Sequence, residues 1–509
     1  MRLPFPERIP LPLATGAAAI LVALQQLQGT GFTFSIYCFL FIVIATIAFN
    51  LAGGFTRPSG SYVFFYAVLG FIFGIVWKAF LGEPGESNLA APILTAQVFT
   101  GGITAMLFAV FVSRKLVGKR ALLENVVDDK DMRNATIGSL FLGTSLVVAS
   151  ILIPHGSGSI LSAVGQVNRF LPLAVILGTT YVIKKSGGTR SINGLLALAI
   201  AINLGFGLVG FSKEGIFYPF LCWLVAASAL RYRLTKSQVV YLILAAVFLV
   251  MYLVPYSQIG RNLQSENASF IDRIELSVSL LGDLGSMRRE YVRSQAENPE
   301  ERTGGYYNHP QGFMDRLTMI AADDALINIT DQGSVFGLQG IYMDFANWVP
   351  HFLWPDKPTE GAGNAFAREI GGILSDDDTT TGISFTPTAE AFHWAKWTGV
   401  LVVAPLIWIL LFTIFDALCG NAQKSPWGLL VVALFAHIAP EGMLDGAIYT
   451  MWFGAWSIII AALAAAYLLP IIGTLVAGPE PTTITRRLRT AAGLGKTLPT
   501  ATAGTSVSS

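Results

Sequence analysis

Two titratable side chains, Glu390 and His393, lie three residues apart near the end of a long polar segment. Side chains at this spacing share one side of a helix, so a helix that begins before Glu390 would bring both to one site. Glutamate and histidine are frequent proton acceptors and donors in catalysis. His351 and His309 are further candidates, because histidine titrates near neutral pH. The alternative for His393 is a place in an aromatic belt, since tryptophans follow it.

Six basic side chains could bind an anion: Arg169, Lys213, Arg261, Arg316, Lys357 and Arg368. A guanidinium pairs bidentately with phosphate oxygens, and a lysine ammonium binds them as a point charge. Each also has a structural interpretation. Arg261 could flank a membrane helix. Arg316 could form a salt bridge with the Asp323-Asp324 pair, and Lys213 could pair with the adjacent Glu214.

The composition indicates a membrane protein. Of 509 residues, 53% are hydrophobic and only 13% are charged, about half the charged fraction of a soluble domain. The net charge of +1 gives no reason to expect nucleic acid as a partner. The three cysteines, Cys38, Cys222 and Cys419, lie in or beside apolar stretches, so we expect core residues and neither a disulfide framework nor a metal cluster.

Apolar runs long enough to cross about 30 Å of hydrocarbon predict an all-α polytopic protein with about 12 transmembrane helices. The first is expected to be an uncleaved helix, because no small-residue cleavage pattern follows it. The expected spans are 13–28, 32–53, 61–81, 93–113, 136–154, 170–183, 192–210, 214–230, 238–256, 397–419, 426–440 and 446–470.

The charges of the connections predict which side faces the cytoplasm. When the connections between spans are assigned to the two sides in turn, fourteen basic residues fall on one side, including the cluster 114–133. The short connections of the other side hold only Lys78, Arg169 and Lys213. The basic set is expected in the cytoplasm, together with both chain ends. The chain then divides into helices one to nine (1–256), an extracytoplasmic loop (257–396), helices ten to twelve (397–472) and a disordered cytoplasmic tail (473–509).

The large loop, residues 257–396, carries ten Arg and Lys against twenty Asp and Glu, a net charge near −10. Apolar residues at three-to-four spacing predict two amphipathic helices, over 274–291 and 313–329. The prolines of the segment 350–358 exclude a regular helix there and predict a shaped loop. The acidic run Asp376 to Asp378 is expected to be a solvated turn, because it lacks the alternating ligands of a calcium loop.

Three features of this loop resemble the Wzy-type polymerases of O-antigen and exopolysaccharide repeat units. They are the Pro350 to Pro358 segment with its Trp-Pro-x-Lys-Pro core, the following Gly361 to Phe366, and the Thr-x-x-x-Glu pattern at Thr386 to Glu390. Family members usually have an arginine after the first proline of that segment, where this chain has His351. The resemblance covers most of the chain as architecture.

The resemblance implies a GT-C-type glycosyltransferase that needs neither metal nor cofactor and works at the outer face of the bacterial cytoplasmic membrane. Its substrate would be an oligosaccharide linked to polyprenyl diphosphate, and a flippase and a chain-length regulator are candidate partners. The six basic residues would then bind diphosphate or sugar, with Arg261 the first choice. Glu390 is the favoured base, with His393 and His351 as further catalytic candidates.

Two other functions fit parts of the pattern. An O-antigen ligase shares the architecture and the lipid donor, but should carry a histidine-led motif that His309-Pro310-Gln311 does not supply. A secondary transporter also fits twelve spans with both ends inside, but transporters generally show related halves and polar breaks in mid-membrane. We find no such repeat, and the large loop follows helix nine rather than the middle of the chain.

Overall fold

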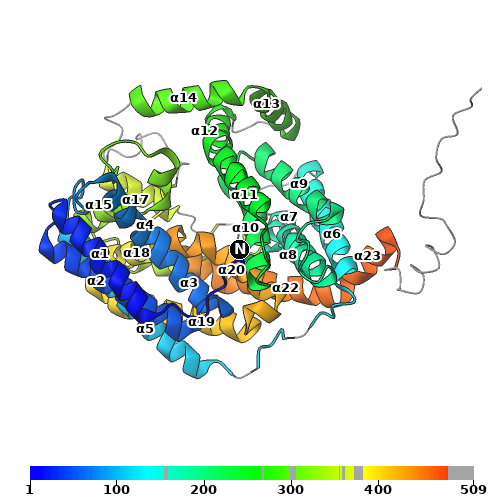
Figure 1. Cartoon of the computed structure of the whole chain (residues 1–509), viewed down its shortest axis with the longest axis horizontal. Coiled ribbons are helices and arrows are strands. Elements are labelled where there is room, and N and C mark those ends of the chain that lie inside the picture. The colour runs from blue at the N-terminus through cyan, green and yellow to red at the C-terminus, as the bar shows by residue number, and fades with distance from the viewer. Residues whose placement is uncertain are drawn as a thin grey trace, which may run out of the picture.

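The computed structural model describes residues 1–118, 120–124, 126–153, 159–265, 269–297, 305–354, 356–357, 361–371 and 382–479. Within these ranges the chain is helical and contains no β-strand (Figure 1). The buried cysteines Cys38, Cys222 and Cys419 are core residues, as expected.

Eight helical segments are long and apolar enough to cross a membrane, which is consistent with a polytopic membrane protein. Several of them contain a π-helical turn between shorter α-helices. They are α2 (Phe32–Ala52), α3 and α4 (Pro58–Ala67, Phe73–Leu81), α5 (Pro92–Leu116), α6 (Met132–Leu152), α7 and α8 (Ile160–Val167, Phe170–Lys185), α11 and α12 (Lys236–Phe248, Val254–Leu263), α18 and α19 (Pro387–Thr398, Ala404–Cys419), and α21 to α23 (Met443–Tyr449, Ala455–Leu463, Leu469–Ala477).

Four shorter helices occupy the remaining positions where the sequence predicts spans: α1 (Leu11–Leu27), α9 (Gly194–Val209), α10 (Lys213–Ala229) and α20 (Pro426–Glu441). The helices form two groups (Figure 1). In one, α2 packs against α1 and α5, and α5 packs against α19; in the other, α6 packs against α8 and α23. Helices α10 and α20 contact each other and both contact α8.

The closest helix contact joins α6 and α23, which are more than 300 residues apart in the chain. A Cβ atom at Gly138 would lie 2.0 Å from the carbonyl oxygen of Leu469, and one at Gly473 would lie 1.9 Å from that of Asn134. Only glycine permits this backbone approach, as at many helix interfaces in membranes. The last helix, α23, is therefore packed directly against α6.

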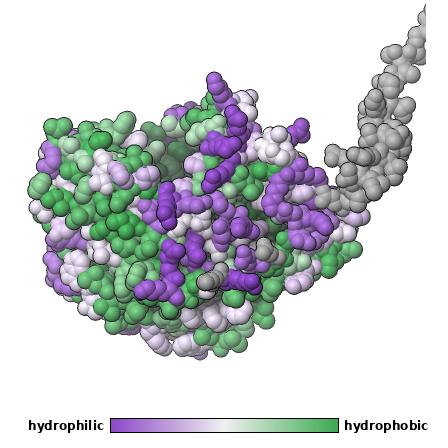
Figure 2. Space-filling view, turned by 60° about the horizontal axis from the view of Figure 1, so that its bottom comes forward, coloured by the Kyte–Doolittle hydropathy of each residue, from purple (hydrophilic) through white to green (hydrophobic). Residues whose placement is uncertain are grey.

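The surface fits a lipid environment. Many large apolar side chains are exposed, among them Leu244 at 58%, Leu406 at 59% and Ile471 at 59%. Figure 2 shows hydrophobic residues on the flanks of the molecule and hydrophilic residues across the middle of the face that it presents. This distribution is expected where helix sides contact lipid and helix ends contact water.

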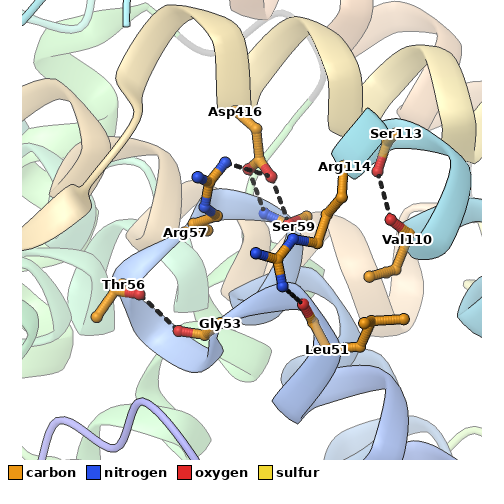
Figure 3. A network of polar contacts seen from close by, with 9 residues as sticks. All are labelled: Leu51, Gly53, Thr56, Arg57, Ser59, Val110, Ser113, Arg114 and Asp416. Atoms are coloured by element: carbon orange, nitrogen blue, oxygen red, sulfur yellow. Dashed lines mark hydrogen bonds and ion pairs between the residues drawn. The ribbon is translucent and has the colours of Figure 1, made fainter. Parts of the chain in front are cut away.

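At one end of the bundle, polar contacts connect α2, α3, α5 and α19 (Figure 3). Buried Asp416, near the end of α19, accepts hydrogen bonds from the backbone N–H (3.0 Å) and the hydroxyl (2.7 Å) of Ser59 at the start of α3. Arg57 lies 3.8 Å from the same carboxylate. Arg114, at the end of α5, donates to the carbonyl of Leu51. We call this end the basic end, and the other, where the large loop lies, the loop end.

The large loop folds into short helices rather than the two that the sequence predicts. The first predicted helix, 274–291, is two helices, α13 (Phe270–Gly282) and α14 (Leu284–Glu297). They separate at Asp283, whose carboxylate accepts the N–H of Ser286 and caps α14. The prediction for 313–329 is confirmed from Ile320 onwards, where α15 (Ile320–Asp331) begins, but extended backbone at Thr318 separates that helix from a 3-10 helix, Gly312–Leu317.

The ends of the loop also differ from the prediction. Helix α12 continues to Leu263, so Arg261 lies on the helix and not in the connection after it. At the far end, α18 carries Glu390 and His393, but non-helical backbone at Ala395 and Lys396 separates it from the long helix that follows. The remaining loop helices are α16 (Gln339–Ala346) and α17 (Ala362–Ile370).

Candidate functional site

The tight turn between α9 and α10 fixes one side of the candidate site. Phe211 occupies this turn with a left-handed backbone, φ 47°. Its carbonyl oxygen accepts hydrogen bonds from Ser257 Oγ (2.5 Å) and from the Arg261 guanidinium (3.5 Å). A Cβ at Gly260 would lie 2.1 Å from the Phe211 ring, so α12 can dock this closely only with glycine there. The contacts place the end of α12 beside the start of α10.

Three predicted anion-binding residues meet at this point, and we call them the basic cluster: Lys213, Arg261 and Arg316. Lys213 Nζ donates to Oε1 of Gln258 at 2.6 Å, and Arg316 donates to the same oxygen at 3.2 Å. Arg261 is close enough to Lys213 for their charges to repel. The ion pairs considered as alternatives, Lys213 with Glu214 and Arg316 with the Asp323-Asp324 pair, do not occur among the described residues, where both cations bind the Gln258 amide.

The 3-10 helix that carries Arg316 is anchored by aromatic stacking. Phe313 stacks on Phe217 of α10 with ring centroids 5.5 Å apart and an interplanar angle of 20°. Such a pair contributes about 0.5–1.5 kcal/mol beyond the burial of its area. The large loop thus brings Arg316 over the helix that starts with Lys213.

A second group of polar residues lies next to the basic cluster. His437 of α20 is hydrogen-bonded through Nδ1 to Glu441 (2.6 Å), and its Nε2 lies 3.9 Å from Glu214 of α10. The Glu441 carboxylate attracts the ammonium group of Lys213. An imidazole between two carboxylates can exchange protons with either, so this group links the cations to an acid–base pair.

Arg169, at the start of α8, continues the polar surface. It lines a cavity of about 430 Å³ together with Asn203, Glu214 and Tyr218. Its buried Nε and the hydroxyl of Tyr218 have no hydrogen-bond partner among the described residues. Arg169 also acts electrostatically on Tyr449 of α21. Tyr449 lines the next cavity, so Arg169 links the two cavities electrostatically.

That next cavity, which we call the acidic cavity, has a volume of about 380 Å³. Its polar lining comes from α7, α16, α21 and the proline-punctuated segment: Ser159, Ser162, Gln166, Asp344, Asn347, His351, Lys357, Asp445 and Tyr449. Burial and the nearby Asp445 carboxylate raise the pKa of Asp344 above its ordinary value. One Asp344 oxygen, Oδ2, is buried without a partner in the described part of the chain.

Lys357 and Trp348 give the proline-punctuated segment its shape. The Lys357 ammonium donates to the carbonyl of Val349 at 2.9 Å and to that of Asn347 at 3.4 Å, which closes the segment on itself. Burial lowers the pKa of Lys357. Trp348 donates to the carbonyl of Ile448 (2.9 Å) and stacks on Trp452 at 5.3 Å. The segment is thereby attached to α21 and forms one wall of the acidic cavity.

Glu390 lies behind this cavity and is not part of its lining. Its fully buried Oε2 accepts the backbone N–H groups of Leu444 and Asp445, at the start of α21. Its Oε1 has no hydrogen-bond partner among the residues described. The carboxylate therefore fixes the start of α21 and with it the position of Asp445.

His393 does not share a site with Glu390. Its Nδ1 lies 2.8 Å from the hydroxyl of Thr330, and its Nε2 lies 3.3 Å from Glu369. The ring packs on Phe336 and Phe366. Because α18 is surrounded by other helices, side chains only three residues apart reach different neighbours.

The structure thus brings together some of the predicted site residues. Lys213, Arg261 and Arg316 meet, and His351 and Lys357 line one cavity. Arg368 is exposed on α17, which packs against α15. His309 is exposed as well. The run 376–378 lies outside the described residues.

Sequence reasoning missed five residues of the site: Gln258, Asp344, His437, Glu441 and Asp445. For His437 and Glu441 a signal exists, since a histidine and an acid four residues apart face the same side of a helix. Ionisable residues within or beside an apolar span are functional candidates by default. Within the described ranges, no group of three or more His, Cys, Asp or Glu side chains is placed to hold a metal ion. Comparisons with protein-family models, curated proteins and solved structures gave no match to this chain.

Proposed function

We propose that this chain is a membrane glycosyltransferase of the Wzy type, which polymerises oligosaccharide repeat units linked to polyprenyl diphosphate. The proposal places it in the bacterial cytoplasmic membrane as a GT-C-like protein with about twelve spans. Its large loop and the polar groups of the loop end then face away from the cytoplasm, where flipped lipid-linked units arrive. The lysine- and arginine-rich connections of the basic end face the cytoplasm, as the bias of positive charge favours.

The observation that carries the proposal is the sharing of one amide oxygen by Lys213 and Arg316, with Arg261 beside them. Three like charges repel, and a neutral glutamine cannot compensate them, while the Glu441 carboxylate acts on Lys213. A bound anion with several oxygens compensates all three, and a diphosphate also gains bidentate bonds from the two guanidinium groups. The site therefore favours binding of a diphosphate group at the end of the helix bundle, and the apolar sides of the bundle suit the lipid tail of such a ligand.

The same cations serve the chemistry of glycosyl transfer. When the bond between the sugar and the diphosphate breaks, negative charge develops on the leaving oxygen. Cations held in advance around that oxygen lower the energy of the transition state. In the proposal, Lys213, Arg261 and Arg316 perform this role.

The test uses the purified full-length protein in nanodiscs. Undecaprenyl diphosphate is the probe for binding, and lipid-linked repeat units extracted from a deletion strain of the host are the substrate. We expect Lys213→Met, Arg261→Met and Arg316→Met each to weaken binding about 10- to 100-fold, the loss of one charge-assisted contact. Each variant should also shorten the polymer made from the repeat units.

Arg289→Met is the matched control, because Arg289 is exposed on α14 of the same loop and bonds only locally, to Ser286. It should bind and polymerise like the wild type. The deletion strain should carry glycan of a single repeat. The proposal fails if that strain keeps its normal chain length, or if none of the three cluster variants changes the binding of undecaprenyl diphosphate.

A further inference from the structure

The acidic cavity contains the kinds of groups that bind sugars. Carboxylates and amides, here Asp344, Asp445, Asn347 and Gln166, form hydrogen bonds with hydroxyl groups. Aromatic rings from Phe352, Tyr449 and Phe453 complete the lining and offer flat apolar surface to the faces of a sugar ring. The volume of about 380 Å³ suits one or two sugar rings rather than a whole repeat unit.

One unsatisfied oxygen at the cavity points to a missing partner. Asp344 Oδ2 is buried and accepts no hydrogen bond from the residues that the structure describes. A buried polar atom without a partner costs about 1–3 kcal/mol, so such atoms are rare unless a ligand satisfies them. The Asp344 and Asp445 carboxylates also lie close enough to interact electrostatically.

The cavity is separate from the basic cluster. Its lining residues come from α7, α16, α21 and the 347–357 segment, whereas the cations lie on α10, α12 and the 3-10 helix Gly312–Leu317. Arg169 acts electrostatically on Tyr449 of the cavity lining. A transferase needs two such places, because the donor and the acceptor must be bound together before one attacks the other.

We infer that the acidic cavity is the acceptor subsite: it holds the terminal sugar of the incoming lipid-linked unit, and the Asp344–Asp445 pair takes the proton of the attacking hydroxyl. This inference rests on the proposed function. The hydroxyl oxygen forms a bond to the anomeric carbon of the donor glycan, and the bond from that carbon to the diphosphate breaks. The diphosphate leaves with the electron pair, held by the basic cluster, and the hydroxyl proton passes to the carboxylate pair.

Each partner of the pair has a distinct task. Two carboxylates that repel each other electrostatically do not both ionise readily, so one is ionised while its neighbour stays protonated. The ionised oxygen accepts the hydroxyl proton. Glu390, which binds the backbone of Leu444 and Asp445, acts as a positioning residue. Lys357 and His351 line the same cavity and are the other charged or titratable groups that face the pair from the 347–357 segment.

The experiment compares Asp344→Asn, Asp445→Asn and the control Asp331→Asn, an exposed acid at the end of α15. We expect all three to bind undecaprenyl diphosphate within about twofold of the wild type. Polymer formation from lipid-linked repeat units should fall about 100-fold or more in the first two, the usual effect of losing a general base. In wild type the rate should fall as the pH drops and the carboxylate pair takes up a second proton, and Asp344→Asn should shift this pH profile.

A further variant distinguishes loss of the cavity from misfolding of the protein. A Cβ at Gly446, which lines the cavity, would meet only the side chain of Ile438, at 4.0 Å. Gly446→Leu should therefore fold, fill the cavity and stop polymerisation without removing a charge, while undecaprenyl diphosphate still binds.

Normal polymer and a normal pH profile in Asp344→Asn, Asp445→Asn and Gly446→Leu would overturn the acceptor subsite and leave the proposed function standing. If the wild type neither binds undecaprenyl diphosphate nor makes polymer, the proposed function fails and the subsite fails with it.

Discussion

Asp323 and Asp324 are neighbours in the chain but hold the starts of two different helices. Asp323 accepts the backbone N–H (3.0 Å) and the hydroxyl (2.6 Å) of Thr386, the N-cap of α18. Asp324 accepts the N–H of Ala91 (3.1 Å) and the hydroxyl of Thr95 (2.7 Å) at the start of α5. One turn of α15 thus joins the large loop to two segments of the bundle.

Asp323→Ala and Asp324→Ala should each destabilise the protein, because each leaves buried donors at a helix start without an acceptor. We expect a loss of about 1–3 kcal/mol per substitution. Reversible denaturation in mixed micelles would measure it. Asp331→Ala, an exposed acid of the same helix, is the control and should change the stability by less than about 0.5 kcal/mol.

Stability should also fall as the pH rises from about 4 to about 7. Burial, with a smaller effect of Asp324, raises the pKa of Asp323 from 3.8 to about 7. The folded protein then binds a proton that the unfolded chain has released, so its extra stability is complete below about pH 4 and lost above about pH 7. Melting temperatures in detergent across this range should show a decline that is smaller in Asp323→Asn. An equal decline in both proteins would contradict the assignment.

The membrane helices could be predicted from the sequence because a span depends on a local property, the hydropathy of about twenty residues. The loop helices could not be bounded in this way. Asp283 and Thr318 interrupt them through side-chain hydrogen bonds to nearby backbone groups, and these residues also occur within helices. The break at Ala395 likewise depends on packing between α18 and the helix that follows.

The site was predictable only as a set of separate candidates. Arg261, Arg316 and Lys213 were identified by charge and position, but their meeting depends on the turn at Phe211 and on the stacking of Phe313. A neutral glutamine gives no signal in the sequence. The separation of Glu390 from His393 could not be foreseen either, because it depends on which helices surround α18.

Gln258 offers a direct test of the electrostatics in the basic cluster. Gln258→Met removes the shared acceptor of Lys213 and Arg316 and should weaken undecaprenyl diphosphate binding about tenfold, since the two cations lose their fixed positions. Gln258→Glu should weaken it more, because a carboxylate there competes with the ligand for the same cations. Titrations at low and high salt would measure both effects. Tighter binding by Gln258→Glu than by Gln258→Met would contradict the prediction.

The break within α18, at Ala395 and Lys396, should respond strongly to substitution. Lys396 has φ 49°, a backbone conformation that favours glycine, so Lys396→Gly should be neutral or stabilise by up to about 1 kcal/mol, and Lys396→Val should destabilise by at least that amount. Gly399→Ala should be far more severe, because its Cβ would lie 1.7 Å from the carbonyl oxygen of Ala391. Yield and melting temperature of the purified variants would rank the three changes.

The network in Figure 3 should contribute to stability in proportion to its buried hydrogen bonds. Ser59→Ala removes one of two bonds and should cost about 1 kcal/mol, whereas Asp416→Ala leaves the start of α3 and Arg57 without their acceptor and should cost about 3 kcal/mol. Glu7→Ala is the control, because its ion pair with Arg231 is exposed and should contribute at most about 1 kcal/mol. Equal losses in all three would contradict this ranking.

The arrangement of cations around the Gln258 amide has a practical consequence for any assay. A concentrated positive charge at a water-filled helix end attracts small oxyanions from the buffer when the lipid is absent. Inorganic phosphate, sulfate and pyrophosphate would then act as competing ligands, and the apparent affinity for lipid diphosphate would depend on their concentrations. The anions of the buffer therefore act as ligands themselves. The reference measurement should use a zwitterionic buffer with chloride as the counter-ion.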